Sequence, residues 1–207
     1  MEINIITGTL LETNNYIITN ENSAILIEAS ADVSRVKQVL EGRKDLGILI
    51  THGHWDHYIN LEKYLREFSC PVYMTKSAFL KITSKEKAFS GDKNPKINLE
   101  NYDVQFIDEQ KKIDFGNNLC FEIIFSPGHT DCSVCYLLHA KETVLFSGDT
   151  VFCQGIGRTD LPTGNLKQMK LSIKKLLELP ENTLILPGHG EATILSQEKS
   201  ELGNIVL

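Results

Sequence analysis

The sequence predicts an α/β fold in which helices cover the faces of β-sheets. Two observations carry this prediction: ten short apolar runs of strand length, and three amphipathic stretches of helical period between them. Because helices are interspersed with strands along the chain, they are expected to pack on sheet faces. With 207 residues the chain is long enough to bury a substantial core.

The predicted strands are runs of four to six residues, rich in β-branched side chains and bounded by turn formers. In chain order they are INII, YIIT, AILIE, GILIT, PVYMT, VQFI, FEIIF, SVCYLL, TVLFS and TLIL. Apolar residues spaced three and four apart predict helices over 33–40 (ended by Gly42), 61–68, and 166–177 (stopped before Pro180). The polar stretch 84–103 is predicted to connect two halves, either as a solvated surface loop or as a lid.

Composition excludes several classes of protein. Hydrophobic residues at 42% and charged residues at 23% are ordinary for a globular chain, and they exclude disordered, collagen-like and coiled-coil proteins. A net charge of −6 with no basic stripe argues against nucleic acid as a partner. No apolar run approaches the roughly 18–20 residues of a membrane span, so no membrane partner is expected.

Compartment and redox state follow from the N-terminus and the cysteines. The start, MEINIITGTL, has no Lys or Arg before its apolar stretch, which argues against a secretory signal. Five cysteines are an odd count, too sparse for a disulfide framework, and Cys132 and Cys135 are expected to pack in the core. The expectation is a soluble cytoplasmic protein with reduced thiols.

The four His- or Asp-bearing turns share one arrangement. The run GILI leads into His52, EIIF into His129, TVLF into Asp149 and TLIL into His189. Because catalytic and binding groups gather on loops outside strand ends, these four turns are expected to meet. The turn after strand 133–138 lies at the opposite edge, so His139 is expected to stand apart from the other five histidines.

The motif His52-Gly53-His54-Trp55-Asp56-His57 carries the strongest chemical signal. In an extended loop, residues two apart project to one side, so His52 and His54 can grip one ion. Asp56 and His57 follow as the chain turns into a helix and can face a second ion. Neutral imidazole and carboxylate suit zinc, and also manganese or iron.

The motifs THGHWDH, PGHT, SGDT and PGHG occur in this order, and together they resemble the metallo-β-lactamase superfamily over nearly the whole chain. The segment GIGRTDLP and the ending around PGHG resemble the short glyoxalase II-like hydrolases (hydroxyacylglutathione hydrolase-like) within it. The resemblance implies a four-layer αββα sandwich of two similar halves, with residues 1–207 as a single domain. It also implies ligands for two metals: for metal 1 His52, His54 and His129, for metal 2 Asp56, His57 and His189, and as a bridge Asp149.

The implied chemistry is hydrolysis of a thioester or similar small acyl substrate. Two divalent cations, most simply zinc, partly neutralised by Asp56 and Asp149, lower the pKa of bound water to around 7. A metal-bridging hydroxide would then attack the acyl carbonyl, which makes Asp56 and Asp149 the catalytic carboxylates. No serine nucleophile is expected, because the chain has no GxSxG motif.

Arg158 is the candidate substrate-binding residue. It lies nine residues past Asp149, where the resembled glyoxalases place a basic contact to the glutathione moiety. A guanidinium can clamp a substrate carboxylate bidentately, so the substrate is expected to be anionic. The alternative is an ordinary structural pair with Asp160.

Two other functions stay open at this point. A persulfide dioxygenase, a relative with its own GRTD segment, uses one iron held by two histidines and one aspartate. A metal-stabilised binding module without catalysis is the second alternative. The 207 residues also lack the C-terminal helical domain with which longer glyoxalase II enzymes bind glutathione, so glutathione recognition stays open.

Overall fold

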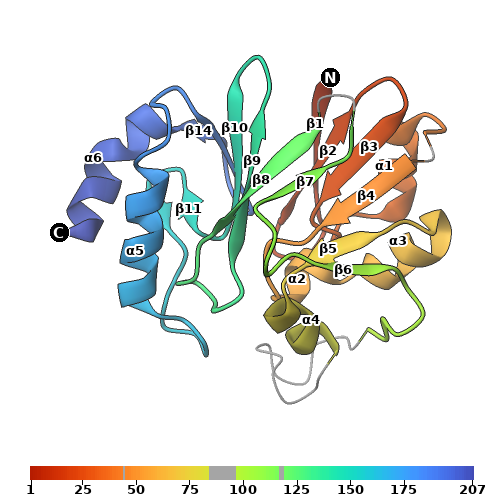
Figure 1. Cartoon of the computed structure of the whole chain (residues 1–207), viewed down its shortest axis with the longest axis horizontal. Helices are drawn as coiled ribbons and strands as arrows, with labels where there is room; N and C mark the ends of the chain where they lie inside the picture. The colour runs from red at the N-terminus through yellow and green to blue at the C-terminus, as the bar shows by residue number, and fades with distance from the viewer. Residues whose placement is uncertain (44, 84–96, 117–118) are drawn as a thin grey trace. The chain divides into compact units, whose positions relative to one another are not determined.

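The computed structural model describes residues 1–43, 45–83, 97–116 and 119–207. The chain divides into two compact units, Met1–Glu109 (unit 1) and Gln110–Leu207 (unit 2), each built on its own six-stranded sheet (Figure 1). The predicted α/β class is confirmed. Of the predicted connection over 84–103, residues 84–96 lie outside the described residues, and 97–103 form turns and irregular backbone.

The sheet of unit 1 combines an antiparallel and a parallel half. Its strands in spatial order are β1 (Glu2–Thr7), β2 (Asn14–Thr19), β3 (Ser23–Ile27), β4 (Asp45–Leu49), β5 (Val72–Met74) and β6 (Val104–Phe106). Strands β1, β2 and β3 pair antiparallel, and β3 to β6 pair parallel. All residues of β2 and β3 are buried, as expected of strands covered on both faces.

Four helices accompany this sheet: α1 (Val33–Leu40), α2 (Trp55–Tyr58), α3 (Leu61–Phe68) and α4 (Lys76–Thr83). The predictions of helices over 33–40 and 61–68 are confirmed. Asp32 begins α1 by accepting a hydrogen bond from the Ser34 backbone N–H, and Glu41 ends it in the left-handed conformation. Helix α4 has no clean apolar stripe, since it buries Lys81 alongside Ala78 and Ile82. The spacing of its apolar residues therefore did not predict a helix.

The sheet of unit 2 is mostly antiparallel. Its spatial order is β14 (Thr193–Ile194), β13 (Leu184–Pro187), β10 (Thr143–Gly148), β9 (Val134–His139), β8 (Cys120–Phe125) and β7 (Lys112–Asp114). Only the β10–β13 pair is parallel among these. A separate two-stranded ribbon joins β11 (Val151–Phe152) to β12 (Gly155–Ile156).

Two helices, α5 (Leu166–Leu176) and α6 (Leu195–Val206), lie beside the sheet of unit 2 (Figure 1). The predicted helix over 166–177 is confirmed, with its end at Leu176. Both helices contribute to one buried apolar cluster with the sheet, whose members include Met169, Ile173, Leu202, Leu137 and Ile185. This packing fixes the strands whose ends carry the candidate ligands.

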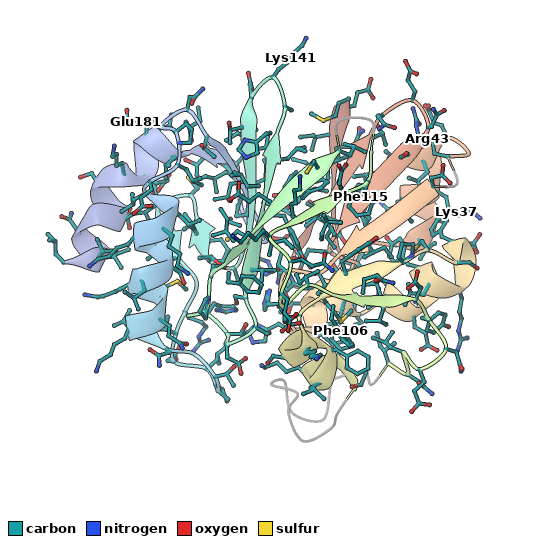
Figure 2. All side chains as sticks on the ribbon, viewed as in Figure 1. Lys37, Arg43, Phe106, Phe115, Lys141 and Glu181 are labelled. Atoms are coloured by element: carbon teal, nitrogen blue, oxygen red, sulfur yellow. The ribbon has the colours of Figure 1, made fainter. Side chains whose placement is uncertain are left out.

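All ten predicted strands are present, and the strands missed are short ones of two or three residues (β7, β11, β12 and β14). The β9–β10 hairpin turns at its predicted position, and Figure 2 shows Lys141 projecting from its tip. His139 lies at this edge of unit 2, exposed and 3.3 Å from Glu122, at the opposite end of β9 from His129. Cys132 and Cys135 are buried, as expected, and neither forms a disulfide with another described cysteine. Within the part of the chain described, no helix is both long and apolar enough to cross a membrane.

Asn15 ties β2 to the segment that follows β3. Its fully buried side chain accepts hydrogen bonds from the backbone N–H groups of Ser30 (2.8 Å) and Ala31 (3.0 Å). It donates to the Thr13 carbonyl (3.0 Å) and to the Ser30 hydroxyl (2.9 Å). The Asn15 side-chain amide therefore provides hydrogen-bond partners for the segment before β2 and for the segment after β3. Candidate ligands lie at this edge of the sheet.

Replacing Asn15 with Ala is expected to lower the free energy of unfolding by about 3 kcal/mol, because buried backbone N–H groups lose their acceptor. Urea denaturation followed by circular dichroism measures the change. Asn22→Ala, at an exposed position in the β2–β3 turn, is the control and should change stability by less than about 0.5 kcal/mol. Equal stability of the two variants would show that the Asn15 contacts contribute nothing net.

Candidate functional site

Parallel pairing of β3 and β4 carries two chain segments to one edge of the unit 1 sheet. Glu28 directly follows β3, and its backbone N–H donates to the carbonyl of Leu49 at the end of β4 (3.0 Å). Thr51 and His52 follow β4, and helix α2 then begins after His54. The HxHxDH motif thus bends from a strand end into a helix within six residues, as its spacing predicted.

The four candidate ligands of unit 1 come together, and all are buried. They are His52, His54, Asp56 and His57, named here the unit 1 ligand group. His52 Nε2 lies 3.0 Å from His54 Nδ1, and His57 Nε2 lies 3.5 Å from Asp56 Oδ2. The rings of His52 and His57 have centroids 4.1 Å apart.

Unit 2 gathers its candidate ligands by the same device. The parallel strands β10 and β13 end together, and Gly188 N–H donates to the Gly148 carbonyl (2.8 Å), so Asp149 and His189 emerge side by side. His129 comes from the connection between β8 and β9. Asp149 Oδ2 lies 3.5 Å from His129 Nε2 and 3.6 Å from His189 Nε2. These three residues are named the unit 2 ligand group.

The donor atoms in both groups have the spacing that a metal ion requires. Two atoms each bound about 2.0–2.1 Å from one tetrahedral zinc ion lie about 3.3 Å apart. The contacts within the groups, from 3.0 to 3.6 Å, bracket this value. Imidazole nitrogen and carboxylate oxygen suit zinc, iron and manganese alike, so the donors fit a divalent cation without selecting among these metals.

In the imidazole rings of His129 and His52, a hydrogen bond at one nitrogen decides whether the other nitrogen can bind a metal. The Arg158 carbonyl can only accept, so His129 Nδ1 donates to it (2.8 Å) and Nε2 carries the lone pair. Thr51 Oγ1 lies 2.5 Å from Glu28 Oε1 and 3.0 Å from His52 Nδ1. Since the carboxylate takes the hydroxyl proton, Nδ1 of His52 donates to Thr51 and its Nε2 also carries the lone pair.

Sequence reasoning missed three residues that contact the unit 1 ligand group. Thr13 donates to Asp56 Oδ2 (3.1 Å), Thr51 contacts His52, and Glu28 Oε1 lies 3.1 Å from His57 Nδ1. Glu28 had a recognisable signal, because it is a charged residue at the end of the buried run AILIE. Thr13 had none, since its contact with Asp56 spans 43 positions of sequence.

Arg158 forms an ion pair with Asp160, which is the alternative that the sequence left open for this residue. Its Nε and Nη2 donate to the two carboxylate oxygens of Asp160 at 2.8 and 2.7 Å. This bidentate contact lowers the pKa of Asp160 to about 2, so the pair stays charged at neutral pH. Both side chains are largely exposed, and the guanidinium uses two of its five donors on Asp160.

Gly157 lets the segment before Arg158 pass directly over the unit 2 ligand group. A Cβ atom at this position would lie 1.8 Å from the Asp149 carbonyl oxygen and 3.1 Å from His129 Cγ. Only glycine permits such an approach. The GIGRTD segment therefore affects His129 and Asp149 in two ways. Gly157 leaves room for them because it has no side chain, and the Arg158 carbonyl accepts a hydrogen bond from His129.

Comparison with known proteins identifies a family and related proteins. Residues 8–189 match the family model of the metallo-β-lactamase superfamily. The hydroxyacylglutathione hydrolase GloC of Haemophilus influenzae is 32% identical over 210 residues, covering 96% of this chain and 95% of GloC.

Solved structures extend the likeness to three dimensions. The BLEG-1 B3 metallo-β-lactamase has a TM-score of 0.89 at 29% identity, with 100% of both chains covered. TTHA1623, solved in a di-iron-bound form, has a TM-score of 0.75 at 28% identity, covering 94% of this chain and 96% of that one. The predicted fold, of the metallo-β-lactamase type, is confirmed by these matches.

Replacing Gly157 with Ala is expected to lower the free energy of unfolding by about 2 kcal/mol or more, because the new methyl group overlaps the Asp149 backbone. It should also weaken metal binding, since Asp149 and His129 must move. Thermal unfolding and metal content measure the two effects. Gly155→Ala is the matched control, because a Cβ there meets nothing within 4 Å. If both variants behave alike, the close approach at Gly157 has no consequence for the ligands.

Proposed function

Because the chain belongs to the metallo-β-lactamase superfamily of metal-dependent hydrolases, we propose that it is a binuclear metal hydrolase acting on a thioester or a similar small acyl substrate. One observation carries the proposal. A single carboxylate oxygen, Asp149 Oδ2, lies within 3.6 Å of the Nε2 atoms of two histidines. An oxygen in this position can be shared between two cations, each held by one of these histidines.

The proposed ligand sets draw on both units. His52, His54 and His129 would hold metal 1; Asp56, His57 and His189 would hold metal 2; Asp149 would be a ligand shared by both ions. The short contacts within each unit support these sets, as does the hydrogen bond that fixes His129 with Nε2 as its donor atom. In this proposal the two units act as one catalytic domain over residues 1–207.

Two divalent ions, when bound, would supply a water that ionises near neutral pH and a Lewis acid for the acyl carbonyl. The side chains of the protein would balance the charge of the ions and orient the ligands. Asp56 and Asp149 offset the charge of the ions, and Thr13 orients Asp56 through its hydroxyl donor. Five of the proposed ligands are buried, which would keep bulk water away and strengthen their interactions with the ions: His52, His54, Asp56, His57 and His129. Zinc is the proposed metal; the di-iron form of TTHA1623 makes iron the first alternative to test.

The proposed substrate is anionic and carries an acyl thioester. The likeness to GloC, a hydroxyacylglutathione hydrolase, favours a glutathione-type thioester. We propose that Arg158 binds its carboxylate with the donors that Asp160 does not use. Asp160 then serves to hold the guanidinium in place.

Metal analysis of protein purified without added metal, followed by assay of S-lactoylglutathione hydrolysis, tests the proposal. Two zinc ions per chain with hydrolysis are expected. One iron per chain with oxygen uptake would instead indicate a persulfide dioxygenase. A metal-loaded protein that is inert towards thioesters, lactones and phosphoesters would indicate a binding module.

Replacing Asp149 with Ala is expected to abolish both metal loading and hydrolysis, because both ions lose their shared ligand. Metal content per chain and turnover of S-lactoylglutathione measure the two losses. Asp114→Ala, an exposed carboxylate on β7, is the control and should keep both. A metal-free Asp149→Ala protein that still hydrolyses the thioester would contradict the mechanism.

Replacing Arg158 with Ala is expected to raise KM about tenfold or more with kcat and metal content nearly unchanged, since a charged contact to the substrate is lost. Arg158→Lys should recover only part of the loss, because an ammonium cannot bind a carboxylate bidentately. Arg43→Ala, whose side chain bonds the Asn20 carbonyl, is the control for loss of an arginine elsewhere. Unchanged kinetics in Arg158→Ala would leave this residue with its structural pair alone.

A further inference from the structure

Glu198 is a buried acid on helix α6, and the proposed reaction does not use it. It is 3% exposed, and a buried carboxylate is costly unless hydrogen bonds satisfy it. Thr193 Oγ1 donates to Oε1 of Glu198 (2.6 Å), and the backbone N–H of Gln154 donates to Oε2 (2.8 Å). Because Gln154 lies 44 positions earlier in the chain, the second bond ties helix α6 to a remote segment of unit 2.

The segment that Glu198 contacts is the tip of the β11–β12 hairpin. Cys153 and Gln154 form its turn, and both are exposed. Gln154 takes the left-handed backbone conformation with φ of 60°, which is uncommon for a residue other than glycine. Such a conformation persists where neighbouring contacts determine it. The hydrogen bond from the Gln154 N–H to Glu198 is one contact that holds the backbone in this conformation.

The base of the β11–β12 hairpin lies at the unit 2 ligand group. One side of the hairpin follows Asp149, and the other side leads into Gly157 and Arg158. The Gly157 N–H donates to the Thr150 carbonyl (3.3 Å), which closes the base. A Cβ atom at position 157 would overlap the Asp149 carbonyl oxygen, so the two chain segments are in close contact there. The course of the hairpin therefore determines where the exposed side chain of Arg158 lies.

The hairpin also contacts a candidate ligand and helix α6. The ring of Phe152 on β11 meets the ring of His189 edge-on, with centroids 6.3 Å apart. Val151 is fully buried in the apolar cluster that includes Leu195 and Leu202 of α6. Apolar packing is not directional, so by itself it does not fix the orientation of a turn. The Glu198 carboxylate supplies a directional bond at the tip of the hairpin.

We propose that Glu198 is a positioning residue for substrate recognition, which fixes the β11–β12 hairpin from helix α6 and thereby sets the position of Arg158. This role rests on the proposed function, in which Arg158 binds the carboxylate of an anionic thioester. Metal loading depends on Glu198 less, because the parallel ends of β10 and β13 place Asp149 and His189. Loss of the Glu198 carboxylate is therefore expected to weaken substrate binding and to spare the metal ions.

Single substitutions on α6 and β14 test this role. Glu198→Ala removes both acceptors. Glu198→Gln keeps the geometry, since the amide oxygen can accept from the Gln154 N–H and the amide nitrogen can donate to the Thr193 hydroxyl. Thr193→Val removes the hydroxyl bond and leaves the contact with Gln154, so it separates lost stability from a loosened hairpin. Glu201→Ala is the matched control, because Glu201 is an exposed acid on the same helix.

Each metal-loaded variant is compared with the wild-type protein. Steady-state hydrolysis of S-lactoylglutathione gives KM and kcat, while metal content per chain and thermal unfolding report on the site and the fold. Hydrogen exchange, followed by mass spectrometry over residues 150–158, reports on the hairpin independently of activity.

Glu198→Ala is expected to raise KM about three- to tenfold, the effect of losing one hydrogen bond, with kcat and metal content nearly unchanged. Hydrogen exchange over residues 150–158 should become faster. Glu198→Gln should recover most of both losses. Thr193→Val should lower the unfolding temperature but keep KM and exchange over the hairpin near the wild-type values, and Glu201→Ala should match the wild type throughout.

A double variant tests whether Glu198 acts through Arg158. Where Arg158→Ala has already removed the guanidinium, Glu198→Ala should raise KM by less than about twofold further, because the two changes affect one contact with the substrate. A full additional increase of KM in that background would overturn the route through Arg158.

Failure of the positioning role can be told from failure of the proposed function. A metal-loaded wild-type protein that hydrolyses no thioester overturns the proposed function and the role of Glu198 in substrate recognition with it. If the wild type hydrolyses the thioester and Glu198→Ala keeps the wild-type KM, the positioning role is wrong while the function stands. If Glu198→Ala does not fold, Glu198→Asp replaces it with the same expectations, because the shorter side chain keeps the charge and cannot reach both partners.

Discussion

Parallel pairing of strands is the constraint on which the candidate site depends. A parallel pair ends at one edge, so the residues that follow both strands must lie close together. Unit 1 uses β3 and β4 to bring Glu28 beside the HxHxDH turn, and unit 2 uses β10 and β13 to bring Asp149 beside His189. Without this register, each of these side chains would be an isolated polar group on a loop.

A second constraint acts on the rings themselves. Each imidazole has two nitrogens, and a partner on one of them decides whether the other can bind a metal. The chain supplies these partners by three different means: a backbone carbonyl behind His129, a hydroxyl behind His52 and a carboxylate beside His57. The candidate ligands are therefore oriented from the side opposite the nitrogen that would bind a metal, by groups that are not themselves candidate ligands.

Much of this could be predicted from the sequence, because period and motif are local properties. Ten strands and three helices follow from apolar spacing, and the four strand-end turns identify the candidate ligands. Helix α4 and the orienting groups could not be found in this way. Lys81 lies buried where an apolar stripe would place a hydrophobic residue, and it packs against Gly53 between the first two histidines. Such a contact depends on tertiary packing, which a single segment of sequence does not encode.

The same distinction explains why Glu28 and Gly157 escaped notice although both lie in recognisable segments. In the sequence alone, Glu28 resembles the polar residue that ends a strand, and Gly157 resembles any of several glycines in turns. Their importance follows from their neighbours: His57 Nδ1 and the Thr51 hydroxyl lie beside the Glu28 carboxylate, and the Asp149 carbonyl oxygen would lie 1.8 Å from a Cβ atom at position 157. Candidate ligand residues can be identified in the sequence by their chemistry. The residues that orient them can be identified only by their contacts in the folded structure. A site of this kind therefore needs a structure before its specificity and affinity can be explained, even where its ligands are evident from the sequence.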